Sequence, residues 1–295
     1  MFPSRFRYEA PRSLDEAIGL LRDGGDYAKV LAGGQSLVPM MKLRFASPEL
    51  IVDINNVPGL AYHQADPDGS LRIGALCRHS DLEFSGLLKG TQPTMAAAAP
   101  LVADPLVRNR GTLVGSLCHA DPQGDWASVM LALGGSVIAQ GPRGRRAIPL
   151  AEFVTGPFEN VLEHDEIAVE AVVPPAAGAR AGGYLKLERR VGDFATVGVA
   201  VAIETSGSDV IRAGIALTGV GGSTIGATEA AAALTGQPLS AGSIAEAAGL
   251  AASAAKPRTD HRGTAEYKRN LVRVFVTRIL GGTTTAATAP AERAA

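Results

Sequence analysis

The stretch "LAGGQSLVPMMKLRF", residues 31–45, places two glycines and a serine between a short apolar strand and a helix-like segment. Glycine at such a point usually means that something approaches the backbone too closely for a Cβ atom. The candidates are a tight turn, a packed strand and a bound phosphate. Successive backbone N–H groups in a tight turn form a concave anion site, and the start of a following helix adds partial positive charge. Taken alone, the loop favours an ordinary strand-to-helix turn.

Two common phosphate-binding motifs are missing from the sequence. The loop does not read G-x-x-x-x-G-K-[ST], because Lys42 stands at the wrong distance from Gly33 and Gly34. No G-x-G-x-x-G lies between a strand and a helix either. The sequence therefore argues against a P-loop NTPase and against a dinucleotide-binding Rossmann domain.

A second loop, "VRNRGTLVGSLCHADPQGDWA" at residues 107–127, repeats the combination of glycine and small hydroxyl residues. Two such loops could grip a pyrophosphate from opposite sides. Asp121 or Asp125, further along the chain, could then bind ribose or ring hydroxyls. The alternative is that Asp121 caps a turn and Asp125 caps the next helix, and the two interpretations are compatible.

Composition places few limits on the partners of the chain. It has 295 residues, 46% of them hydrophobic, with a formal net charge of −1. That length suffices for one large or two medium domains. The near-neutral charge gives no electrostatic argument for a nucleic-acid or membrane-surface partner. The basic run at residues 143–146 lies beside Pro and Gly and predicts a solvated hairpin tip.

No apolar run approaches the ~18 residues of a spanning helix, and the N-terminus lacks the apolar core of a signal peptide. We therefore expect a cytoplasmic protein without a transmembrane segment. Cys77 and Cys118 are too few for a thiolate-held cluster and are expected to be small buried hydrophobes. The histidines show no metal-ligand spacing, and His119, in the second loop, is expected at the surface or in a cap.

The order of predicted elements indicates an α+β fold. A helix is expected at residues 13–23, begun by a capping box of Ser13 and Glu16. The segment 112–117, "TLVGSL", is predicted to be a strand. Other strands are expected at 27–34, 48–55, 70–76, 136–150 (a hairpin) and 165–174, with helices at 93–103 and 126–134.

The segment 174–183, "PPAAGARAGG", predicts a domain boundary. We expect a first domain at 1–173, with lobes at about 1–55 and 56–173, and a second domain at 174–281. The second domain should contain three meandering strands and helices at 227–234, 243–252 and 260–280, with Ser243 and Glu246 at capping-box spacing. Residues 282–295 predict a disordered tail.

Four motifs in fixed order resemble the FAD-binding medium subunit of molybdenum hydroxylases, the family of the carbon monoxide dehydrogenase medium subunit and the xanthine dehydrogenase flavin domain. They are "AGGQSLVPMMKLR", "VRNRGTLVGSLCHADPQGDW", "RRVGDFATVGVA" and "DHRGTAEYKRNLVRVFVTR". The resemblance runs from about Phe2 to Leu280. It implies a two-lobed FAD-binding domain of the PCMH (vanillyl-alcohol-oxidase-like) type, followed by a small three-stranded sheet with helices.

The resemblance also implies a set of cofactor-binding residues. Asp125 matches the acidic residue near the polar edge of the flavin, and Lys186 matches a lysine beside the cofactor. On the residues alone, Lys186 could equally be an exposed strand lysine, and Phe194 would by default be core. The remaining matches are Ala32, Gly33, Gly34, Gln35, Ser36 and Leu37 in the first loop, Gly111, Thr112, Leu113, Val114, Gly115, Ser116 and Asp121 in the second, and Val102, Ala168 and the aromatic Phe194 as further contacts.

Two positions depart from the family pattern. The second loop commonly reads T-I-G-G-S, but Val114 replaces its first glycine. If that glycine needs a positive φ, FAD would bind more loosely or the loop would shift. Gln35 stands where a histidine is frequent. Some related flavoproteins attach their flavin through a loop histidine, so Gln35 implies a non-covalent FAD.

The implied function is electron transfer. FAD in this chain would accept electrons from 2Fe–2S clusters in a small partner subunit, after oxidation of a substrate at molybdenum in a large one, and deliver them to an external acceptor. A dimer of heterotrimers, hence a heterohexamer, is the implied assembly. No residue here is expected to hold molybdenum or iron, and no catalytic side chain is needed because flavin does the redox work.

Two alternatives stay open at this point. One is a self-contained FAD-dependent NAD(P)H reductase with the same type of FAD domain, which would need a proton donor beside the flavin. The other is a flavin-free scaffold, for which Val114 is the only hint. The residues name neither the substrate of the complex nor its acceptor.

Overall fold

The computed structural model describes residues 2–288. The N-terminal lobe is a small parallel sheet covered by helix α1 (Leu14–Gly24). Its strands stand in the order β1 (Arg7–Glu9), β3 (Leu50–Asp53) and β2 (Ala28–Leu31). The Ser13 side chain caps helix α1 as predicted, because it accepts a hydrogen bond from the Glu16 backbone N–H. The Glu16 carboxylate accepts from the Arg12 N–H and not from Ser13, so the return half of the predicted capping box is not formed. Helix α2 (Leu37–Lys42) follows β2 across the glycine loop.

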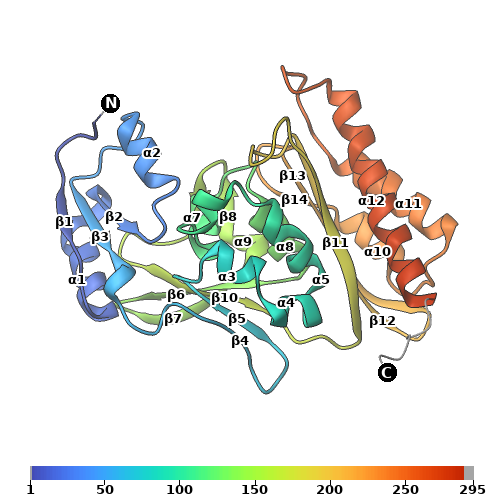
Figure 1. Cartoon of the computed structure of the whole chain (residues 1–295), viewed down its shortest axis with the longest axis horizontal. Coiled ribbons are helices and arrows are strands. Elements are labelled where there is room, and N and C mark those ends of the chain that lie inside the picture. Colours follow the sequence, from blue (N-terminus) through green and yellow to red (C-terminus); the bar gives the residue numbers. More distant parts are fainter. Residues whose placement is uncertain (1, 289–295) are drawn as a thin grey trace.

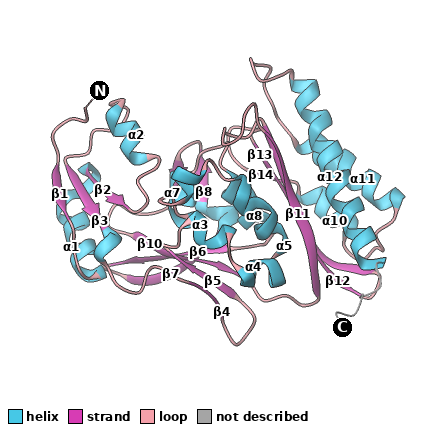
Figure 2. Ribbon diagram, viewed as in Figure 1, coloured by secondary structure: helices cyan, strands magenta, loops and turns pink. Residues whose placement is uncertain are grey.

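The second lobe is built on a five-stranded antiparallel sheet that runs beneath a group of helices (Figures 1 and 2). The strand order is β4 (His63–Ala65), β5 (Leu71–Gly74), β10 (Ile167–Val173), β6 (Ser136–Gly141) and β7 (Gly144–Pro149). Above it lie α3 (His79–Glu83), α4 (Gly86–Thr91), α5 (Pro93–Ala98), α6 (Pro105–Arg108), α7 (Leu113–His119), α8 (Asp125–Ala132) and α9 (Leu150–Phe153), with the short hairpin β8 (Val154–Gly156) and β9 (Glu159–Asn160).

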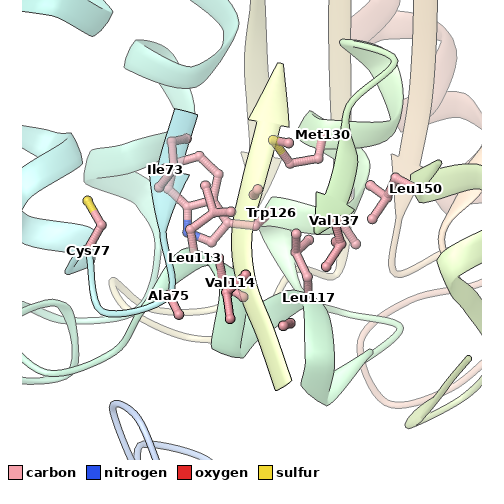
Figure 3. Close-up of a cluster of buried hydrophobic side chains, with 14 of the residues drawn as sticks. Ile73, Ala75, Cys77, Leu113, Val114, Leu117, Trp126, Met130, Val137 and Leu150 are labelled. Carbon is pink, nitrogen blue, oxygen red and sulfur yellow. The ribbon is translucent and has the colours of Figure 1, made fainter. Parts of the chain in front are cut away.

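The core of this lobe forms where the helices meet the sheet. Trp126 on α8 is fully buried in it, beside Leu113 and Leu117 of α7 and Ile73 of β5 (Figure 3). Burying a large apolar side chain in this way stabilises a fold by about 1.5–3 kcal/mol. The rigid support for any site above the sheet therefore comes from α7 and α8.

The C-terminal part is a four-stranded sheet between two layers of helices. The strands are β11 (Ala179–Leu187), β12 (Val197–Ser206), β13 (Asp209–Thr218) and the short β14 (Ile225–Gly226), so a fourth strand joins the predicted three. On the outer face lie α10 (Thr228–Leu234), α11 (Ala241–Ala254) and α12 (Ala265–Thr288) (Figure 1). The inner face packs against α5 and α8 of the second lobe.

Strand β12 contributes side chains to two hydrophobic cores, one on each face of the sheet. Val199 and Val201 point into the core with α10–α12, whereas Ala200 and Ala202 belong to the core of the second lobe. This alternation is the two-residue period of a strand. The small residues face the second lobe and allow close approach: a Cβ on Gly214 of β13 would overlap the Ala132 carbonyl oxygen. The α+β fold predicted from the sequence is confirmed.

The prediction of a strand at residues 112–117 is wrong. The segment is the helix α7, because the Thr112 side chain accepts a hydrogen bond from the Gly115 N–H and caps the first turn. Leu113 and Leu117 are spaced four residues apart and both face the core, which is the period of a helix. Ala120, with a φ of 51°, ends it in the left-handed conformation.

Three details of the C-terminal part also differ from the prediction. Strand β11 begins inside the expected boundary segment, because residues from Ala179 onward pair with β12. The capping box of α11 joins Ser240 to Ser243, and Glu246 takes no part in it. Helix α12 begins five residues later than expected, after a turn closed between Asp260 and Gly263.

Helix α12 also overruns the predicted start of the disordered tail. It continues to Thr288. The last residues of the helix include alanines, and alanine has the highest helix propensity of all residues. The rest of the predicted tail, residues 289–295, lies outside the described residues.

Candidate cofactor site

A cavity of about 630 Å³ opens between the N-terminal lobe, the second lobe and the β11–β12 loop. Every cofactor-binding residue in the predicted set except Leu113 lines it. From the first loop these are Ala32, Gly33, Gly34, Gln35, Ser36 and Leu37, from the second Gly111, Thr112, Val114, Gly115, Ser116 and Asp121, and from other elements Val102, Asp125, Ala168, Lys186 and Phe194. Segments far apart in the sequence thus converge on one hollow.

The two glycine loops touch each other at the cavity. A Cβ on Gly33 would lie 2.7 Å from Gly111 Cα and closer still to the Arg110 carbonyl oxygen. Gly34 has a φ of 74°, a conformation that other residues rarely adopt. Both glycines of the first loop are therefore required by the backbone, one for close approach and one for its φ.

The first loop offers unused hydrogen-bond donors. Among the described residues, no acceptor is found for the backbone N–H groups of Gly33, Gly34, Gln35 and Ser36. Four successive N–H groups of this kind form the concave nest that binds anions. The Gln35 side chain turns back to donate to the Gly33 carbonyl oxygen at 3.1 Å.

Arg78 and Asn55 fasten the two loops together. Asn55 donates to the Ala32 carbonyl oxygen at 2.8 Å and accepts from Arg78 Nη2. Arg78 Nη1 donates to the Arg110 carbonyl oxygen at 2.7 Å. Sequence reasoning missed this connection, because its members lie in three separate segments and match no local motif.

Val114 has an ordinary place in the structure. It is the second residue of α7, it is 2% exposed, and it packs into the core (Figure 3). It is not among the described residues with positive φ. The backbone here therefore needs no glycine, and the only hint of a flavin-free scaffold disappears.

The inner wall of the cavity carries a buried network of charges. Lys186 Nζ lies 3.1 Å from Asp125 Oδ2, 3.3 Å from Glu188 Oε2 and 2.8 Å from the Leu101 carbonyl oxygen. Tyr184 donates to Asp125 Oδ1 at 2.6 Å. The Lys186 side chain is 1% exposed, so its interpretation as an exposed strand lysine is wrong.

Burial governs the acidity of this network. Burial raises the pKa of Asp125, and the Lys186 charge opposes that rise. The pKa of Tyr184 is raised well above its usual range, mainly by burial and also by the neighbouring carboxylate. Because Asp125 lies on α8 and Lys186 on β11, the pair also joins the second lobe to the C-terminal sheet.

The outer rim of the cavity is aromatic. Phe194 is 50% exposed in the loop between β11 and β12, so its default interpretation as a core residue is wrong. Arg262 Nη1 holds this loop by donating to the Phe194 carbonyl oxygen at 3.0 Å. Phe158, which sequence reasoning missed, lines the cavity with a φ of 61° and packs against the His119 ring, 5.1 Å between centroids.

Asp121 caps a turn, as the alternative interpretation of this residue predicted. Its Oδ1 accepts from the Gln123 backbone N–H at 2.8 Å. Asp125, by contrast, is the first residue of α8 and gives its side chain to Tyr184 and Lys186 instead of capping the helix.

His79 is a further lining residue that the sequence did not single out. It is 4% exposed, and its Nδ1 accepts a hydrogen bond from the Trp126 indole N–H at 2.9 Å. Burial lowers its pKa to about 4, with smaller contributions from Arg108 and Arg78. Sequence reasoning could not identify His79 as a cavity residue, because no residues near it in the sequence resemble a binding motif.

We find no candidate metal site within residues 2–288. Within the described residues, no three His, Cys, Asp or Glu side chains gather into a possible metal site. Burial raises the pKa of both Cys77 and Cys118 to about 12, so both thiols stay protonated at neutral pH. None of the helices within residues 2–288 combines the length and apolar character needed to span a bilayer.

Comparison with known families agrees with this geometry. The family described as "FAD binding domain in molybdopterin dehydrogenase" matches residues 4–176, more than half of the chain. The chain belongs to this family. The family described as "CO dehydrogenase flavoprotein C-terminal domain" matches residues 183–283. The resemblance noted in the sequence is confirmed, and the chain is an oxidoreductase subunit with a FAD-binding domain.

Full-length relatives are dehydrogenase subunits. The chain is 40% identical over 280 residues to the carbon monoxide dehydrogenase medium chain of Hydrogenophaga pseudoflava, covering 95% of this chain and 97% of the relative. It is 39% identical over 282 residues to the alpha subunit of the 6-hydroxypseudooxynicotine dehydrogenase complex of Paenarthrobacter nicotinovorans, covering 95% of each.

Solved structures show the same fold. The structure of carbon monoxide dehydrogenase from Hydrogenophaga pseudoflava that lacks the Mo-pyranopterin moiety of the molybdenum cofactor contains a chain with a TM-score of 0.92 and 41% identity. The match covers 97% of this chain and 99% of the other. The predicted two-part flavoprotein architecture is thereby confirmed.

Proposed function

We propose that this chain is the FAD-containing electron-transfer subunit of a molybdenum and iron–sulfur hydroxylase or dehydrogenase. The observation that carries the proposal is the convergence of the two glycine loops on one cavity, in a chain of the FAD-binding family. Two relatives that match along almost the whole chain are named as a medium chain and as a subunit of a dehydrogenase complex, which supports a role within a larger complex.

The residues present fit FAD. The cavity of about 630 Å³ falls inside the range of about 300–1,000 Å³ found for small-molecule and cofactor sites. The second loop occupies the space that a Cβ on Gly33 would need, so the two loops lie in direct contact at the cavity. The unpaired N–H groups of residues 33–36 are suited to the pyrophosphate.

Each wall of the cavity has its own part in the proposal. The two loops bind the pyrophosphate, Asp125 and Lys186 orient the polar side of the ring system, and Val102 and Ala168 supply apolar contacts. Phe194 covers the ring at the exposed rim and limits the entry of water. The FAD is non-covalent, because Gln35 offers no nucleophilic side chain for attachment.

When bound, FAD supplies the redox chemistry, moving electrons between a partner's iron–sulfur clusters and an external acceptor. The chain's own residues hold and shield it and carry out no bond-breaking step. Molybdenum and iron–sulfur cofactors would then belong only to a large and a small partner subunit. We further propose a dimer of heterotrimers and a cytoplasmic location.

The proposal includes a domain division. Residues 1–173 would form the FAD-binding domain, with lobes at about 1–55 and 56–173, and residues 174–281 the C-terminal flavoprotein domain. Its support is the separate core of the outer helices, although the inner face of the C-terminal sheet shares the core of the second lobe.

Affinity purification of the tagged chain from its native host tests the proposal. We expect one large and one small co-purifying subunit, together with FAD, molybdenum and iron in the same particle. A yellow protein that purifies alone, contains no metal and is reduced by NAD(P)H would contradict it and favour a self-contained reductase.

A further inference from the structure

We infer that His79 is a fixed, neutral hydrogen-bond donor to the pyrophosphate of the bound cofactor. The inference rests on the proposed function, since it assigns a further binding residue to the same cavity. It begins from the hydrogen bond between His79 and Trp126 and requires no charge on the imidazole.

The bond to Trp126 fixes the tautomer of His79. An indole N–H can only donate, so the Nδ1 atom that receives it at 2.9 Å must be unprotonated. A neutral imidazole carries one proton, which must then lie on Nε2. Trp126 is itself fully buried in the core, and this burial fixes the position of the indole N–H that donates to His79 (Figure 3).

The Nε2 donor is left without a partner. Among the residues that the structure describes, none accepts a hydrogen bond from His79 Nε2. His79 is 4% exposed and lines the cavity. A ligand in the cavity would supply the acceptor that this donor lacks.

The donor lies against the phosphate-binding loop. An added Cβ on Gly111 would lie 2.7 Å from His79 Cδ2 and 2.8 Å from Nε2. The His79 backbone N–H also donates to the Gly111 carbonyl oxygen at 2.9 Å. Both residues line the cavity, and only the absence of a Cβ on Gly111 leaves space beside the ring edge.

The ligand chemistry follows from these neighbours. The first loop, whose backbone N–H groups at residues 33–36 are free, lines the same cavity as His79. Such a set of donors recognises an anionic oxygen. Within FAD, the pyrophosphate is the anionic group, so it is the expected acceptor.

Two substitutions of His79 test its Nε2 donor separately from the hydrogen bond that its Nδ1 accepts from Trp126. In His79→Asn, the amide oxygen takes the place of Nδ1 for Trp126, but the outer donor is lost. In His79→Gln, the amide nitrogen reaches the place of Nε2. We expect His79→Asn to weaken FAD binding by about 10- to 100-fold and His79→Gln to stay within about threefold of the wild type. The exposed His261 gives a control, His261→Asn, with unchanged affinity.

The measurement is the dissociation constant of FAD for the deflavinated full chain, purified with any subunits that accompany it. Phosphorus NMR of the bound FAD gives a second readout, because a purely structural role of His79 would leave the pyrophosphate signals of His79→Asn unchanged. Nitrogen NMR of histidine-labelled protein should show His79 protonated on Nε2.

Equal FAD affinity in His79→Asn and the wild type would overturn the inference, as would unmoved phosphorus signals, or a proton on Nδ1. Equal weakening by both substitutions would overturn it as well. Failure of the wild-type chain and its complex to bind FAD would instead refute the proposed function itself.

Discussion

Replacing Lys186 with methionine should destabilise the protein strongly. The Lys186 side chain is 1% exposed and Asp125 is 7% exposed, so neither charge is well solvated. Methionine removes the cation that lies 3.1 Å from Asp125 and 3.3 Å from Glu188 and leaves both carboxylates without it. Removing one partner of a buried pair costs about 3–5 kcal/mol. That is a large fraction of the ~5–15 kcal/mol by which proteins are usually stable.

Denaturant unfolding at neutral pH measures this loss. The exposed Lys89 on α4 provides the control, since Lys89→Met should change stability by no more than about 0.5 kcal/mol. The double variant with Asp125→Asn removes one of the two uncompensated charges. It should lose less stability than the two single losses added together, because the two residues are in direct contact.

The loss should also depend on pH. In the native protein, burial raises the pKa of Asp125 above its usual value of 3.8. The folded chain then binds this proton more tightly than the unfolded chain, so stability falls as pH rises from the usual pKa through the raised one. Without Lys186 the pKa rises further and the fall extends to higher pH. A Lys186→Met variant within about 1 kcal/mol of the wild type at pH 7 would refute this reasoning.

Three further predictions concern the loops, the sheet and a thiol. Gly33→Ala should separate the two loops and lower the FAD content of the purified protein, whereas Gly19→Ala on α1, with open space around its Cβ, should keep it; equal FAD content would contradict the role of the contact between the loops. Gly214→Ala should cost about 1–3 kcal/mol in denaturant unfolding through its overlap with α8, and a neutral result would contradict that close packing. Cys77, which is buried and whose pKa burial raises to about 12, should resist alkylation at pH 8 in the folded protein and react once it is unfolded, as mass spectrometry would show; rapid labelling of Cys77 in the folded chain would contradict its burial.

Local patterns were sufficient for much of the fold. Ser13 and Glu16 marked the start of α1, and the turn residues of the β6–β7 hairpin marked its tip. The two glycine loops were visible because close backbone approach and positive φ demand glycine, a requirement that stays within a few residues. The same loops carried the resemblance to the family.

Features that depend on tertiary contacts could not be read in this way. Lys186 is buried only because α8 brings Asp125 to it, and the sequence alone left its exposure undecided. His79 and Trp126 are 47 residues apart, so their hydrogen bond has no local signature. The α7 segment was misassigned because its apolar residues suit a strand, whereas the Thr112 cap and the four-residue spacing of Leu113 and Leu117 belong to a helix.

The central claim is that FAD in this chain connects a partner's iron–sulfur clusters to an external acceptor. The most direct measurement removes FAD from the isolated complex and follows two half-reactions: reduction of the iron–sulfur centres by the complex's own substrate, and reduction of an external acceptor. We predict that the first persists and that the second is lost until FAD is added back. Acceptor reduction that continues at its full rate without FAD would contradict the account.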